Sequence, residues 1–490
     1  MATSFYDVVV IGSDLGATVA GAVLSQQGFR VLVAGVPRKE RYEIGPYVLP
    51  RSPLCLTYPD SAIFKRIFGD LNLLQLVRRR IEPNRPAYQV ILPNHRIDVD
   101  AQFLADELAR EMPDVTVQPL LERSSNLCSA LESLLAEDPP LPPEGFWERR
   151  EITRLSAKLP LGEIDLDSPL PPEHLFRLLR RLPALFALDD ASPSTLAIAR
   201  AFDLHLRGTY RIDGGRESLR SLLFDRIEAH SGEIRAELEP KSIEIKRGKV
   251  AGVSFSGRGQ SVGCSNVICG LPARTVMNML EGDRPPKRLV ESAAREPSHY
   301  RYRLQVVAPL EAIPPPLARL SFSVRDPSAP LERANALAIH FADGYGQHAV
   351  VSVEALQPAG ELRPESLAAL RQSMRQHLLE IFPFIEQHIV LEHSPHDGQP
   401  PTSIEQWEAP PSVPMDAVWR FDAPNSEARA FGVSGVHSTT GIKKLYLASR
   451  QVLPALGLEG ELKAGWNAAK RVLSTEKKRD LVKGEVLLGG

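Results

Sequence analysis

The feature that most restricts the fold is the segment 7–35, which holds two apolar runs separated by a glycine turn and a helix-forming stretch. The first run, Val8 to Ile11, has the length and composition of a buried strand, and the second strand is expected at Arg30 to Ala34. Strand, glycine turn, helix and strand in this order form a dinucleotide-binding βαβ unit, which aims the N–H groups of a helix N-terminus at a phosphate. We therefore expect an α/β protein built on a Rossmann-like layer.

The motif G-x-G-x-x-G of such units is incomplete in this chain. Gly12 takes the first position, but Asp14 takes the second and Ala17 the third, and Gly35 stands where an acidic residue would bind the ribose hydroxyls. A carboxylate 4–5 Å from a phosphate costs about 3–4 kcal/mol at an effective dielectric of about 20. Loss of the ribose contact adds about 1.5–3 kcal/mol. The motif therefore supports the Rossmann-like fold strongly, but its departures argue against tight binding of a dinucleotide.

Composition excludes several classes of protein. The chain has 490 residues and a formal net charge of −2, which suits two or three domains and gives no basic surface for nucleic acid. Four scattered cysteines predict neither a disulfide framework nor a metal site. No apolar run approaches the ~20 residues of a membrane span, and the first strand begins almost at once, so a cytoplasmic protein is expected.

Period-two and helical patterns divide the chain into segments. Helices are expected at about 60–80, 100–112, 216–230, 364–381 and 460–472, a mostly helical region at 120–205, and strands at 88–92, 95–99, 233–238, 242–246, 249–254, 261–269, 300–306, 319–324, 336–340, 349–354 and 445–448. The strands from 299 to 356 predict an antiparallel sheet with one wet face. A split dinucleotide-binding domain is expected at 1–60, 205–295 and 430–475, an inserted α+β substrate domain at 61–204 and 296–429, and a tail at 476–490.

Three blocks of sequence in this order and spacing carry a family resemblance. They are the βαβ unit at 7–35, the Gly-Gly turn, helix and hairpin at 210–219, 232–235 and 248–253, and the C-terminal segment at 445–449, 454–460 and 464–465. With these blocks, most of the chain resembles the FAD-dependent oxidoreductases of the phytoene desaturase, carotenoid isomerase and amine oxidase group. The resemblance implies a glutathione-reductase-like, Rossmann-type FAD-binding domain.

The resemblance also assigns roles by position. It implies pyrophosphate contacts from Gly12, Ser13, Leu15, Gly16 and Ala17, a close turn beneath the flavin at Gly214 and Gly215, and flavin or ribityl contacts from Gly457, Glu459 and Gly460. Further departures from the family pattern are Ser449 and Ala455 in place of glycines, Pro240 where a backbone N–H would meet adenine, and a missing Gly-Gly-Arg segment after the second strand. Arg38 and Lys39 are the nearby cations that would replace its arginine.

Three functions remain open on this basis. The first is a flavin-dependent oxidoreductase with an atypical, weak FAD site, which desaturates or isomerises an apolar substrate. The second is a catalytically silent relative that keeps the fold without FAD to bind a lipophilic molecule or a protein partner. The third is a protein that uses the nucleotide fold for another ligand, for instance a phosphorylated ribose near Gly35, Arg38 and Lys39. No catalytic residue is identified, since a flavin would carry the chemistry.

Two further segments allow two interpretations each. Residues 174–188 are basic and very apolar, which fits either a membrane-surface segment or a pair of packed helices broken at Pro183. The alternation Tyr300-Arg301-Tyr302-Arg303 fits either the lining of a pocket or, as we prefer, an ordinary half-buried strand. His393 and His437 are interpreted as incidental, and Trp466 as a core residue.

Overall fold

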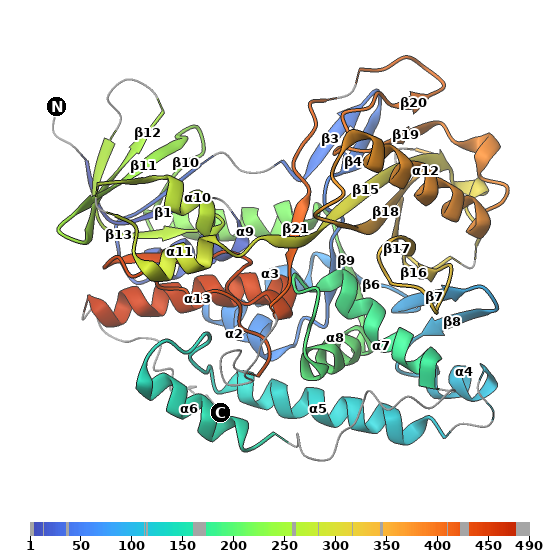
Figure 1. Cartoon of the computed structure of the whole chain (residues 1–490), viewed down its shortest axis with the longest axis horizontal. Helices are drawn as coiled ribbons and strands as arrows, with labels where there is room; N and C mark the ends of the chain where they lie inside the picture. The colour runs from blue at the N-terminus through green and yellow to red at the C-terminus, as the bar shows by residue number, and fades with distance from the viewer. Residues whose placement is uncertain are drawn as a thin grey trace.

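The computed structural model describes residues 4–12, 14–35, 39–111, 113, 116–159, 173–256, 261–282, 284–315, 317–343, 346–408, 410–421 and 431–476. Ser13, Arg38 and almost all of the expected tail at 476–490 therefore lie outside the described residues. Two large sheets dominate the fold, one on the left and one at the upper right of Figure 1, with most helices below and between them.

The first sheet has eight strands that come from three distant parts of the chain. Its order is β10-β2-β1-β13-β12-β11-β14, and β22 pairs with β13. The strands are β1 (Phe5–Ile11), β2 (Val31–Ala34), β10 (Glu233–Arg235), β11 (Pro240–Lys246), β12 (Lys249–Phe255), β13 (Ser261–Cys269), β14 (Leu280–Glu281) and β22 (Leu445–Leu447). Strands β2, β1, β13 and β22 run parallel, as the βαβ unit predicts, and β11 to β13 are antiparallel. A mixed α/β fold with a parallel sheet is thus confirmed, while the domain boundaries stay a prediction.

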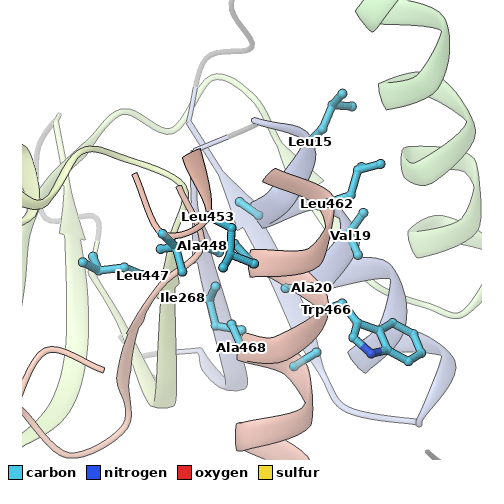
Figure 2. Packing of buried hydrophobic residues seen from close by; sticks show 14 of the residues in the cluster. Leu15, Val19, Ala20, Ile268, Leu447, Ala448, Leu453, Leu462, Trp466 and Ala468 are labelled. Atoms are coloured by element: carbon cyan, nitrogen blue, oxygen red, sulfur yellow. The ribbon is translucent and has the colours of Figure 1, made fainter. Parts of the chain in front are cut away.

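Helices α1 (Leu15–Gln26) and α13 (Gly457–Thr475) pack against each other beside this sheet. Figure 2 shows the apolar residues gathered between these helices and strands β13 and β22, among them Val19, Ile268 and Leu462. Trp466 is buried in the same cluster, as predicted. Helix α9 (Gly215–Ala229) packs on α1, and α10 (Ala273–Asn278) and α11 (Lys287–Ala293) follow β13 along the chain.

The second sheet has nine strands in the order β20-β19-β15-β18-β17-β16-β7-β8, with β21 on β15. They are β7 (Tyr88–Leu92), β8 (His95–Val99), β15 (Pro297–Pro309), β16 (Leu320–Val324), β17 (Arg333–Asp343), β18 (His348–Pro358), β19 (Leu391–His393), β20 (Thr402–Ser403) and β21 (Asp416–Trp419). Tyr302, Leu304 and Val306 of β15 form a core with helix α12 (Pro364–Ile381).

The opposite face of this sheet corrects the sequence-based expectation of a wet face. Arg301 and Arg303 alternate with the core residues of β15, yet they are only 3% and 2% exposed. Both arginines line a cavity, but Tyr300 and Tyr302 do not, so the pocket interpretation holds for the arginines only, and the expectation of a half-buried strand is wrong for them. The pattern predicted the alternation, but it could not show that other elements cover the polar face.

The other described helices, short strands and turns complete the fold. They are α2 (Ala62–Asp70), α3 (Leu74–Arg78), α4 (Leu104–Glu111), α5 (Gln118–Ala136), α6 (Phe146–Ser156), α7 (Glu173–Ala187), α8 (Thr195–Arg207), the short strands β3 (Arg41–Ile44), β4 (Tyr47–Pro50), β5 (Cys55–Thr57), β6 (Ile81–Pro83) and β9 (Thr209–Ile212), and the 3₁₀ turns η2 (Leu310–Ala312), η3 (Glu386–His388) and η4 (Pro454–Leu456).

Helix α7 continues through Pro183, so the predicted break there is wrong. Proline has no N–H for the carbonyl four residues earlier, which usually weakens a helix. Here the hydroxyl of Tyr88 donates to that carbonyl, Leu179 O, at 3.3 Å. Leu179 and Leu182 are buried in a core with β7 and β16, which favours the packed-helix interpretation of residues 174–188. Contact of this segment with a membrane surface stays a prediction, and no described helix is long and apolar enough to cross a bilayer.

Candidate functional site

The N-terminus of α1 is the place where the fold would present N–H groups to an anion. Gly12 ends β1 with φ +93°, a conformation that suits glycine, and Asp14 caps the helix without a hydrogen bond from its side chain to the first turn. Leu15, Gly16 and Ala17 form the buried first turn. The structure thus brings the described residues of the predicted pyrophosphate set together at one point.

Helix α13 approaches this point more closely than side chains would allow. A Cβ on Gly16 would lie 2.4 Å from Glu461 O and 2.5 Å from Ala448 O, and one on Gly465 would lie 1.7 Å from Gly16 O. These glycines let the two helix backbones touch. As a result, the N-terminal half of α13, at Glu461 and Gly465, lies directly against the first turn of α1.

Glu461, in the second turn of α13, occupies the anion position at α1. Its Oε1 accepts from Gly16 N at 3.4 Å, and its Oε2 pairs with Arg216 and lies 3.8 Å from Arg450 Nε. The side chain is 0% exposed. Burial opposes its ionisation, but the charges of Arg216 and Arg450 hold the pKa of Glu461 below its ordinary value. The helix N-terminus therefore already carries an ionised carboxylate.

The adenosine side of the expected cofactor site lacks its usual donors and acceptors. Gly35 has a φ of +120°. A Cβ at this position would lie 3.3 Å from Gly12 N and 3.8 Å from Cδ of Pro240. Gly35 has no side-chain carboxylate for a ribose, and Pro240 has no N–H for adenine. Lys39 is exposed, and Arg38 falls outside the described residues, so the phosphorylated-ribose interpretation stays a prediction.

As arranged, these residues do not fit the pyrophosphate of FAD. A phosphate at the α1 N-terminus would meet the Glu461 carboxylate, and a like charge at about 4 Å costs about 4 kcal/mol at an effective dielectric of about 20. The sequence pattern did not reveal Glu461, because a motif compares neighbouring positions, whereas Glu461 lies 445 residues from Gly16. The sequence signal that could have indicated a carboxylate at this site is the presence of two glutamates, Glu459 and Glu461, within one turn of the C-terminal helix.

The other predicted flavin residues lie at the edge of two cavities or within the packing. Gly214 and Gly215, with φ +78° and +57°, open α9 and line a cavity of about 310 Å³. A Cβ on Gly457 would lie 2.1 Å from Ala187 O, and one on Gly460 would lie 1.9 Å from Leu453 O, so both glycines serve close packing. Glu459 lines an adjoining cavity of about 130 Å³ and pairs with Arg200 at 2.6 Å.

Buried ion pairs form the polar floor of the smaller cavity. Glu354 of β18 accepts from Arg301 Nη1 and from Arg303 Nε, each at 2.7 Å. Arg303 Nη1 also donates to Asp416 at 2.7 Å, and Arg450 lies 3.3 Å from the same carboxylate. Burial opposes ionisation of Glu354, but the two β15 arginines hold its pKa below its ordinary value. The network joins the nine-stranded sheet to α13 through Arg450 and Glu461.

The imidazole of His340, on β17, lines both cavities and makes no hydrogen bond with another described residue, whereas the backbone of His340 pairs with β16 and β18. Burial lowers the pKa of His340 to about 4, so the ring is neutral near pH 7 and offers one donor and one acceptor. The opposite wall of the smaller cavity is apolar and includes Leu56, Phe64, Phe186 and Phe322. Within the described part of the chain, no group of His, Cys, Asp and Glu is placed to bind a metal ion.

Comparison with known proteins identifies the fold. No protein-family model matches the chain, and no curated protein matches it. Among solved structures, an oxidoreductase from Methanosarcina mazei is 15% identical with a TM-score of 0.59, over 96% of this chain and 99% of its own.

Two oxidases are similar to the same extent. A triple mutant of putrescine oxidase is 13% identical with a TM-score of 0.59, over 96% of this chain and 100% of its own. Cyclohexylamine oxidase from Brevibacterium oxydans IH-35A is 13% identical with a TM-score of 0.54, over 96% and 99%. These neighbours give no support specific to phytoene desaturase. At these identities the likeness establishes the fold alone.

Proposed function

We propose that this protein, which has the fold of the amine oxidase-like oxidoreductases, binds a small amphipathic molecule in the paired cavities and does so without FAD. One observation carries the proposal. The cavities have an apolar wall around Phe64, Phe186 and Phe322, a floor of charges that already neutralise one another, and a neutral His340 imidazole that makes no hydrogen bond with another described residue. Such a lining suits a ligand with an apolar body and one polar group.

The sizes and charges of the cavities narrow the ligand. Volumes of about 130 and 310 Å³ lie at or below the lower end of the range for drug-sized ligands, which is about 300–1,000 Å³, and are small for a long polyene. Because Arg301 and Arg303 are both engaged by carboxylates, the polar group would be recognised by hydrogen bonding to His340. A wholly apolar substrate is thus less favoured than the sequence suggested.

Binding of the amphipathic fluorophore 8-anilinonaphthalene-1-sulfonate tests this proposal. We expect saturable binding at one site, weakened about 5–10-fold by His340→Leu, since a net hydrogen bond is worth about 1 kcal/mol. Leu204→Trp should abolish binding by filling the smaller cavity, which Leu204 lines. His388→Leu, at an exposed residue that lines neither cavity, is the control. Equal binding by all four proteins would reject the cavity as the site.

The second candidate is a flavin-dependent oxidoreductase that acts on such a ligand. The similar solved structures and the glycine turn at Gly214 and Gly215 favour it. The absorbance spectrum of the protein as purified, followed by titration with FAD, separates the two. Flavin bands at stoichiometric amplitude would support the oxidoreductase, whereas no bands and no saturable FAD binding would support binding without redox chemistry.

A further inference from the structure

The contacts of Glu461 are those of a bound anion. One carboxylate oxygen accepts from the N–H of Gly16, in the first turn of the twelve-residue helix α1, and the other pairs with Arg216 and faces Arg450. A helix N-terminus combined with two guanidinium groups is a common setting for phosphate in proteins. Here the anion is covalently part of α13, and its side chain is fully buried.

We propose that Glu461 is a built-in substitute for a phosphate ligand: it fills an anion site at the N-terminus of α1, and the site accepts pyrophosphate or a nucleoside diphosphate once the carboxylate is removed. The inference concerns α1 and α13 and does not depend on the ligand of the cavities. It explains why the βαβ unit keeps its geometry although Asp14 and Gly35 oppose a dinucleotide. The helix dipole and the two arginines are satisfied from within the chain.

The alternative is that Glu461 is an ordinary buried ion pair with no separate anion site. Both interpretations predict that removal of the carboxylate destabilises the fold, because Arg216 and Arg450 would be left with less compensation. They differ in what can replace it. An anion site with a helix N-terminus would select polyvalent phosphates, whereas a simple ion pair would show only general salt effects.

The test is chemical rescue of Glu461→Ala. Thermal unfolding would be measured for the wild type and the variant in inorganic pyrophosphate, ADP, and sodium chloride of equal ionic strength. We expect a lowered Tm for Glu461→Ala that pyrophosphate and ADP raise saturably and chloride does not, and no such rise for the wild type. The matched control is Glu354→Ala, which also leaves two buried arginines with less compensation but has no helix N-terminus among its contacts.

Glu461→Ser provides the second variant if Glu461→Ala does not fold, because serine leaves most of the site open but keeps a polar group there. Calorimetric titration with pyrophosphate should show at least about 10-fold tighter binding to Glu461→Ser than to the wild type, since the carboxylate's charge and most of its volume have been removed. Equal affinity for the two proteins, or equal rescue of Glu354→Ala, would overturn the proposal. Ligand binding in the cavities is tested independently, by the fluorophore titration of the wild type.

Discussion

Two glycines decide how closely the first and last helices of the chain meet. Gly16 and Gly465 face each other across α1 and α13, and a Cβ on Gly465 would lie 1.7 Å from the backbone oxygen of Gly16. Because backbone rather than a flexible side chain stands in the way, the helices would have to separate. That separation would also move Glu461 from Gly16 N.

We therefore predict that Gly465→Ala lowers the free energy of unfolding by about 3 kcal/mol or more, although alanine is the better helix former. Gly69→Ala is the matched control, since Gly69 also lies within a helix and a Cβ there would meet nothing within 4 Å. The control should be neutral or up to about 1 kcal/mol more stable. Urea unfolding of the three proteins measures both changes, and similar effects at the two glycines would contradict the packing argument.

Individual residues also show which contacts a sequence motif can predict and which it cannot. The positions of Gly12, Asp14 and Gly35 followed from the sequence, because the strand, turn and helix around them are local. Glu461 and Arg450 could not be linked to Gly16 in the same way, since only the folded chain brings residues 16 and 461 together. The sequence therefore predicted a weakened cofactor site, but it did not predict the carboxylate of Glu461 at the N-terminus of α1.

At the scale of single elements, α7 shows how a helix tolerates an internal proline. Pro183 leaves Leu179 O without its usual N–H, and the Tyr88 hydroxyl of β7 donates to it. A sequence pattern registers the proline as a break because the compensating donor lies on a strand about ninety residues away. The position of the helix was predictable, but its continuity depended on tertiary structure.

The compensation can be tested with a double-mutant cycle. Tyr88→Phe should cost about 1–2 kcal/mol, because a buried carbonyl loses its hydrogen bond. In the Pro183→Ala background, the new backbone N–H can donate to Leu179 O, so the cost of Tyr88→Phe should fall by about half or more. Chemical denaturation of the four proteins gives the coupling energy. A coupling near zero would mean that the hydroxyl does not replace the helix bond.

At the scale of the whole molecule, the polar face of the nine-stranded sheet is buried, including the charged side chains of Arg301, Arg303 and Glu354. The alternation of β15 predicted a sheet with one polar face, yet Arg301 and Arg303 of that face line a cavity whose other walls come from β5, α7, α8 and α13. The sequence identified most strands of both sheets, but not the short strands β14, β19, β20 and β21. It did not identify the burial of Arg301, Arg303 and Glu354, because burial arises only when the sheets come together.

Buried histidines give this arrangement a measurable dependence on pH. Burial lowers the pKa values of His205, His340 and His393 to about 4, below the ordinary 6.5. Between about pH 6.5 and 4 the unfolded chain binds protons that the folded protein does not, so stability rises with pH in this window and is fully present above it. Each histidine contributes up to about 1.4 kcal/mol per pH unit.

We expect the urea midpoint to be nearly constant above pH 7 and to fall steadily from pH 6.5 to 4.5. The carboxylates of Glu354 and Glu461, whose pKa values are lowered, add a loss of stability only below their ordinary value of 4.5, so the first part of the fall reports the histidines. His205→Gln should make the slope shallower, since His205 is buried and its Nδ1 contacts Ala201 O at 2.6 Å. The exposed His388→Gln should leave the slope unchanged, and a flat profile for the wild type would mean that the buried rings accept protons without cost.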